Sequence, residues 1–144
     1  MNLDDLYRRV IMDHYKTPRN YGKFEDSEAI TIELNNPTCG DKITLQLIIE
    51  EQQVQDVKFL GEGCSISLSS ASMMTDAIKG KSLEEALQLA DHFSALMKGE
   101  NTSFDYEDIE ALSGVNKFPA RIKCATLAWN AMRKGIAQSN EQHS

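Results

Sequence analysis

Three cysteines in three distinctive segments are the residues of this chain best suited to chemistry. They are Cys39 in a Pro-Thr-Cys-Gly-Asp turn, Cys64 after Gly-Glu-Gly, and Cys124 in an Arg-Ile-Lys-Cys segment. The two nearest cysteines are 25 positions apart (64 − 39), so only folding can bring them together. If it does, Asp41 accompanies Cys39 and completes a Cys3Asp set, which suits a tetrahedral divalent metal.

The predicted surroundings of the cysteines favour ionised thiols. Gly40 lets the chain turn tightly enough to aim Cys39 and Asp41 together. We predict Cys64 and Cys124 near helix N-termini, where free N–H groups and the helix dipole stabilise a thiolate. The alternative is three unrelated buried thiols, because cysteine is often buried. That alternative fits Cys124 as well as a metal site does, whereas the polar turn around Cys39 favours a site.

Composition and charge narrow the class of protein. The 144 residues favour one domain, and because there is no linker or repeat we place no boundary within residues 1–144. A net charge of −7 argues against nucleic acids and anionic membranes as partners. There is no visible signal peptide and no apolar run near the roughly 20 residues of a membrane span. Three cysteines without a Cys-x-x-Cys pattern indicate a reducing, cytoplasmic compartment.

The hydrophobic pattern predicts an α+β fold. A helix should run from residue 3 to just before Thr17-Pro18, because the residue before proline avoids the α region. Apolar residues then alternate with polar ones, which predicts a three-stranded antiparallel sheet with one buried face. Four helices should follow and pack on one face of this sheet. The predicted strands cover residues 30–34, 43–50 and 54–60, and the predicted helices cover 65–79, 82–99, 106–112 and 119–138.

Four segments carry a family resemblance. They are Leu-Tyr-Arg-Arg-Val-Ile-Met-Asp-His-Tyr-Lys-Thr-Pro-Arg-Asn (6–20), Asn-Pro-Thr-Cys-Gly-Asp (36–41), Gly-Glu-Gly-Cys-Ser-Ile-Ser (61–67) and Arg-Ile-Lys-Cys-Ala-Thr-Leu-Ala-Trp (121–129). In type and order they resemble the IscU/NifU-N-like iron–sulfur assembly scaffolds, most closely the SufU-type branch. The resemblance implies a single domain over residues 1–144 with the SufE/NifU-like fold.

Three departures from the cluster-building scaffolds indicate the SufU type. Lys123 stands where those scaffolds carry histidine, and residues 117–121 read Lys-Phe-Pro-Ala-Arg in place of their Leu-Pro-Pro-Val-Lys chaperone motif. The second and third cysteines are 60 positions apart (124 − 64), and the excess corresponds to residues 100–115. SufU-type proteins resemble the scaffold but act as zinc-dependent sulfur acceptors for a cysteine desulfurase.

The resemblance implies a zinc-dependent sulfurtransferase, with zinc held by Cys39, Asp41, Cys64 and Cys124. Cys39 is expected to leave the metal first, because its short loop can move, and a histidine of the partner would replace it. The freed thiolate would take persulfide sulfur from a SufS-type desulfurase and pass it to downstream SUF cluster-assembly proteins. Arg121, one helical turn before Cys124, would pair with Asp41 or Cys39 and assist ligand exchange. A solvated surface arginine is nearly as good a reading of Arg121.

Two other functions use the same residues: a scaffold that assembles an iron–sulfur cluster on these ligands, or a structural zinc domain without a labile cysteine. The histidines are set aside as ligands: His14 is expected to be structural or partner-facing, His92 lies mid-helix, and His143 lies in the tail. No Gly-x-Ser-x-Gly elbow accompanies the serines of the 65–79 helix, so we expect them to allow close helix packing.

Overall fold

The computed structural model describes residues 3–25, 29–36, 40–100 and 107–142. The elements are α1 (Leu3–Lys16), β1 (Ile30–Asn36), β2 (Asp41–Glu50), β3 (Gln53–Glu62), α2 (Ser65–Ile78), α3 (Leu83–Met97), α4 (Glu107–Glu110), the 3₁₀ helix η1 (Ser113–Lys117) and α5 (Pro119–Gln142).

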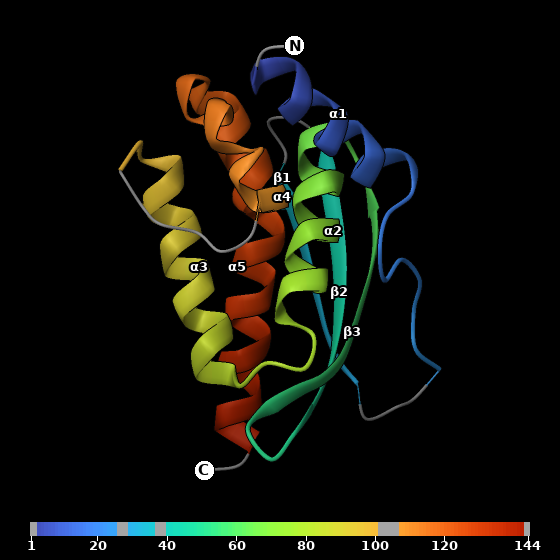
Figure 1. Cartoon of the computed structure of the whole chain (residues 1–144). Coiled ribbons are helices and arrows are strands. Elements are labelled where there is room, and N and C mark those ends of the chain that lie inside the picture. Colours follow the sequence, from blue (N-terminus) through green and yellow to red (C-terminus); the bar gives the residue numbers. More distant parts are fainter. Residues whose placement is uncertain (1–2, 26–28, 37–39, 101–106, 143–144) are drawn as a thin grey trace.

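The predicted antiparallel meander is confirmed, with strand order β1-β2-β3. On β2 the side chains of Ile43, Leu45 and Leu47 are fully buried and alternate with less buried ones, as the period-two pattern predicts. Helices α2 and α5 cover this face of the sheet, and α3 packs on the outer side of α5 (Figure 1). The Phe93 and Trp129 rings stack between α3 and α5 with centroids 4.7 Å apart.

Helix boundaries mostly match the sequence pattern. Ser82 caps α3 by accepting a hydrogen bond from the Glu85 amide at 3.1 Å, and Pro119 opens α5, as predicted. The predicted 106–112 helix is instead a single α-turn followed by η1. The reason lies in the backbone hydrogen bonds. In this stretch an amide donates to the carbonyl three residues earlier, as in a 3₁₀ helix, for example from Leu112 to Ile109. Within the described chain no helix is both long enough and apolar enough to cross a membrane.

The structure corrects one placement that bears on the site. Sequence reasoning puts Asp41 on the loop between the first two strands, but Asp41 is the first residue of β2 and pairs with Asn36 of β1. The Gly40 amide donates to the Asn36 carbonyl at 2.9 Å, and each of the two strands extends two residues beyond its predicted end, to the Asn36–Asp41 pair. Asp41 therefore has the fixed orientation of a strand residue.

His14 joins three helices. Its side chain is 1% exposed and bonds Ser72 of α2 through Nδ1 and Asp108 of α4 through Nε2, each at 2.7 Å. Because an ionised carboxylate only accepts, Nε2 donates to Asp108. The Arg19 amide also donates to the Ser72 hydroxyl at 2.8 Å. His14 is therefore a structural residue that connects α1, α2 and α4.

We predict that Asp108→Ala lowers the free energy of unfolding by roughly 1–2 kcal/mol, because it removes a charged acceptor from a buried imidazole. The matched control is Asp91→Ala, which removes an exposed carboxylate paired with Arg133 at 3.0 Å and should cost less than about 0.5 kcal/mol. Urea unfolding of both variants at equal metal content measures the difference. Equal costs would contradict a structural role for the His14 contact.

Candidate metal centre

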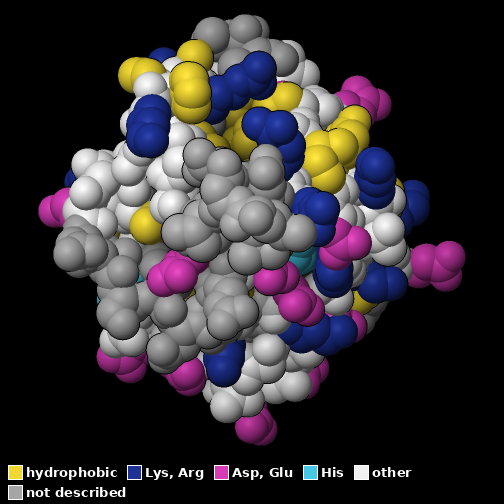
Figure 2. Space-filling view, turned by 45° about the horizontal axis from the view of Figure 1, so that its top comes forward, with side chains coloured by type: hydrophobic (Ala, Val, Ile, Leu, Met, Phe, Trp, Pro, Cys, Tyr) yellow, Lys and Arg dark blue, Asp and Glu magenta, His cyan; other side chains and the backbone are white. Residues whose placement is uncertain are grey.

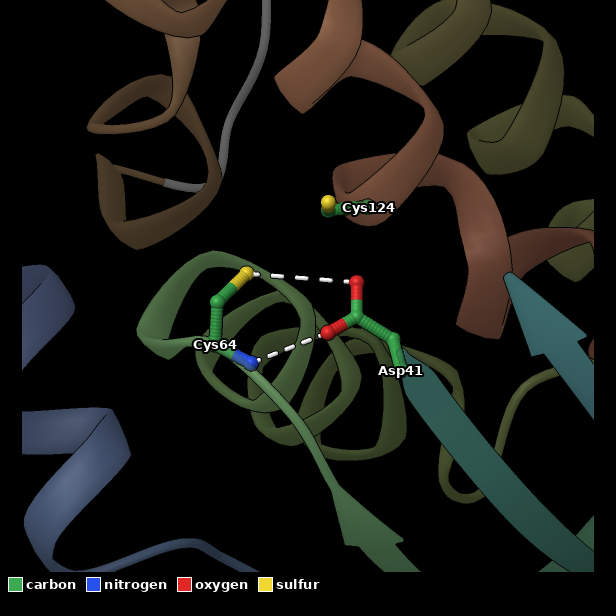
Figure 3. A group of neighbouring side chains, drawn as sticks. All are labelled: Asp41, Cys64 and Cys124. Carbon is green, nitrogen blue, oxygen red and sulfur yellow. Dashed lines mark hydrogen bonds between the residues drawn. The ribbon is translucent and has the colours of Figure 1, made fainter. Parts of the chain in front are cut away.

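Three of the four predicted ligands converge from separate elements. Asp41 comes from the start of β2, Cys64 directly precedes α2, and Cys124 lies in the second turn of α5 (Figure 3). Their candidate ligand atoms all lie within 4.8 Å of one another. Figure 1 shows the end of β3 and the starts of α2 and α5 meeting at the upper end of the molecule. The fourth predicted ligand, Cys39, lies outside the described residues, two positions before Asp41.

The Asp41 carboxylate is buried, with 1% of the residue exposed. Its Oδ1 accepts a hydrogen bond from the Cys64 amide at 3.0 Å. The first turn of α2 has no acidic residue of its own, so Asp41 supplies the negative charge at this helix N-terminus. None of the ion pairs among the described residues involves Asp41. Because buried charges are usually paired or bound to a metal, Asp41 is a candidate metal ligand.

Gly63 makes room for this carboxylate. Its φ is +145°, which L side chains rarely adopt, and a Cβ placed there would lie 2.9 Å from Asp41 Cγ and overlap Oδ1. Only glycine at position 63 therefore allows the Cys64 amide to reach Asp41. The Gly-Glu-Gly-Cys pattern in the sequence thus reflects a close approach of two backbone segments.

Cys64 and Cys124 differ in their surroundings. Cys64 is partly exposed, and its Sγ lies 3.9 Å from Asp41 Oδ2 and 3.9 Å from the Ser67 hydroxyl. Cys124 is fully buried, and its Sγ lies 3.7 Å from both the Asn36 side-chain amide and the Ala120 carbonyl. The two thiols therefore approach the Asp41 carboxylate from two different helices, α2 and α5. Solvent can reach Cys64 but not Cys124.

Ser70 fixes α2 against α5, the helices that begin near the two thiols. Its hydroxyl donates to the carbonyl of Ala125, the residue after Cys124, at 2.6 Å, and accepts from Trp129 Nε1 at 3.1 Å. Ser67, Ser69, Ser70 and Ser72 are all fully buried. The serines of α2 thus pack closely, as predicted, but they also hold neighbouring elements by hydrogen bonds.

One of the ligand separations is close to that of a tetrahedral zinc site. Zn–S distances of about 2.3 Å and Zn–O distances of about 2.0 Å imply ligand atoms roughly 3.5–3.8 Å apart. The observed separation of 3.9 Å between Asp41 Oδ2 and Cys64 Sγ is within a few tenths of an ångström of that requirement. One carboxylate and two thiols fill three positions, and a fourth donor would close the site.

Arg121 is the remaining predicted site residue. It lies in the first turn of α5 with an exposed side chain, and its backbone amide donates to the Phe118 carbonyl. Its assisting role remains a prediction. Sequence reasoning missed Asn36 as a contact of Cys124. The sequence did offer one signal for Asn36: it is the first residue of the Asn-Pro-Thr-Cys-Gly-Asp segment, and it ends a strand.

Comparisons with known proteins find relatives that match nearly the whole chain. The family model described as NifU-like N terminal domain matches residues 6–144. The zinc-dependent sulfurtransferase SufU of Bacillus subtilis is 60% identical over 95% of this chain and 93% of its own length. The iron–sulfur cluster assembly scaffold protein IscU of Streptococcus pyogenes is 50% identical over 98% of this chain and 89% of its own. A crystal structure from Fervidobacterium islandicum, described as a candidate scaffold for the SUF system, superposes with a TM-score of 0.82 at 32% identity and covers 88% of this chain and 93% of its own.

Gly63→Ala should weaken zinc binding, because the new methyl group displaces the Asp41 carboxylate. Loss of ligand orientation of this kind typically costs 10- to 100-fold in metal affinity. Gly80→Ala is the matched control: its φ of +82° imposes a comparable backbone strain, but a Cβ there meets no heavy atom within 4 Å. Competition with a chromophoric zinc chelator measures both affinities. An affinity for Gly63→Ala equal to that of Gly80→Ala would show that Asp41 does not hold the metal.

Proposed function

Since this chain belongs to the family of NifU-like N-terminal domains, we propose that it is a zinc-dependent sulfurtransferase, which accepts persulfide sulfur from a cysteine desulfurase and passes it into iron–sulfur cluster assembly. The observation that carries the proposal is the convergence of Asp41, Cys64 and Cys124 from three elements, with Cys39 two positions from Asp41. This convergence supports a metal site to which the neighbouring Cys39 would add a reactive thiol.

The proposed zinc ligands are Cys39, Asp41, Cys64 and Cys124. Bound zinc would keep the thiols ionised and hold the ligand-bearing segments together. The donor set supports zinc, because thiolates with one carboxylate suit a borderline-soft ion that needs no redox change. The buried Asp41 carboxylate supplies the hard donor, and the Cys64 amide fixes its direction.

Cys39 is the proposed sulfur acceptor. Its thiolate attacks the outer sulfur of the desulfurase's cysteine persulfide. A new sulfur–sulfur bond forms on Cys39, the sulfur–sulfur bond of the donor breaks, and the donor cysteine leaves as a thiolate. Cys39 is proposed as the ligand that moves, because the sequence predicts it in a short loop that can move without unwinding a helix.

The start of α5 is the proposed docking surface for a SufS-type desulfurase. Phe118 is 60% exposed. The basic residues Lys117, Arg121 and Lys123 lie near it in the sequence, and residues 111–140 contain no Asp or Glu. Figure 2 turns the upper end of Figure 1 toward the viewer and shows hydrophobic and basic side chains beside one another there. Such a surface suits a partner with an acidic rim around an apolar contact.

Arg121 is proposed to assist this exchange, because it lies one helical turn before Cys124 and its side chain is exposed at the start of α5. A cytoplasmic location suits this chemistry, since thiols stay reduced there. The delivered sulfur is proposed to reach downstream SUF cluster-assembly proteins.

Cys39→Ala should abolish the acceleration of a SufS-type desulfurase, because the acceptor sulfur is gone. The measurement is sulfide or alanine release with and without this protein. Asp91→Ala, which changes an exposed carboxylate on α3, is the folded control and should accelerate the enzyme as the unmodified chain does. Acceleration retained by Cys39→Ala eliminates the mechanism.

Metal analysis distinguishes the proposed sulfurtransferase from a scaffold on which an iron–sulfur cluster is assembled. Protein as isolated should be colourless with about one zinc per chain, because a Cys3Asp set is complete for a tetrahedral ion. Elemental analysis and the visible absorption spectrum provide the test. A brown protein that contains iron and sulfide would favour the scaffold function instead.

A further inference from the structure

Asn36 connects the segments that carry the proposed ligands. It is the last residue of β1 and is 7% exposed. Its side-chain Nδ2 donates toward Cys124 Sγ across 3.7 Å, a contact between residues 88 positions apart. Its carbonyl accepts from the Gly40 amide at 2.9 Å, and it pairs with Asp41 in the sheet. The buried side-chain amide of Asn36 therefore contacts Cys124, and its backbone carbonyl contacts Gly40, the residue that follows Cys39.

The amide distinguishes Cys124 from Cys64. An amide N–H that donates to a thiolate stabilises the charge on sulfur and lowers its tendency to react or to be protonated. The nearest hydroxyl to Cys64 Sγ, that of Ser67, already donates to the Cys64 carbonyl at 3.0 Å. Of the two described thiols, Cys124 is thus the one that receives a side-chain amide donor.

We propose that Asn36 is a positioning residue that fixes Cys124 as the anchoring ligand, the last of the three thiols to separate from the metal. This inference rests on the proposed zinc site and adds an order to it: Cys39 leaves first, and Cys124 stays bound longer than Cys64. The physical reason is that loss of Cys124 would leave both a buried thiolate and a buried amide without their partners.

Alkylation during zinc removal tests the order. The zinc-loaded full chain is treated with stepwise chelator and iodoacetamide, and peptide mass spectrometry gives the rate of modification at each cysteine. Burial alone would also make Cys124 slow, so the variants decide. In Asn36→Asp and Asn36→Leu, which remove the donor, modification of Cys124 should become roughly tenfold faster.

The matched control is Asn35→Asp, which adds the same charge one position earlier, at an exposed residue of β1. Its Cys124 should react as slowly as in the unmodified chain. Unchanged Cys124 rates in both Asn36 variants would overturn the proposal. A chain that binds no zinc at all would instead overturn the proposed function, so the two failures are distinguishable.

Two further measurements do not depend on activity. In the unmodified protein, the Asn36 side-chain amide protons should shift in the NMR spectrum on zinc loading, whereas those of Asn35 should not. In cobalt-substituted protein, the sulfur-to-cobalt charge-transfer band should move in Asn36→Leu. Asn36 protons that are insensitive to zinc would overturn the proposal even if both Asn36 variants failed to fold.

Discussion

The structure depends on one buried carboxylate and the amide that holds it. Asp41 has been moved out of water at the first residue of a strand, where an isolated negative charge is costly. The Cys64 amide and the N-terminus of α2 offset part of that cost, and Gly63 allows the contact. The other carboxylate oxygen, Oδ2, lies 3.9 Å from Cys64 Sγ, so a cation bound between the carboxylate and the thiols would offset more of the cost.

Helix packing converts this local contact into a site. Cys64 and Cys124 precede or open different helices, so their separation depends on the packing of α2 on α5. Ser70 sets that packing by bonding the carbonyl next to Cys124 and the Trp129 indole. Buried hydroxyls suit this task, because they are small enough for close helix contact and fix the register through directional bonds.

Local patterns predicted the fold well, and long-range contacts escaped them. The alternation of Ile43, Leu45 and Leu47 and the cap at Ser82 are properties of neighbouring residues, so the sequence alone predicts them. Three of the four predicted ligands, Asp41, Cys64 and Cys124, do converge, because the cysteines lie in distinctive segments and Asp41 lies beside one of them; that they bind a metal stays a prediction. The Asn36–Cys124 contact joins residues 88 positions apart, and no local pattern encodes it. The turn from α4 into η1 was missed because a helical period cannot distinguish i+3 from i+4 bonding over so few residues.

The described candidate ligands come from positions 41, 64 and 124, which span more than half of the chain. Their convergence requires the sheet and the packing of α2 and α5 on it. No fragment that lacks α5 can present the complete donor set. A partner that recognises the loaded centre therefore also checks the integrity of the whole domain, and an unfinished or damaged chain is excluded from sulfur traffic without a separate quality-control signal.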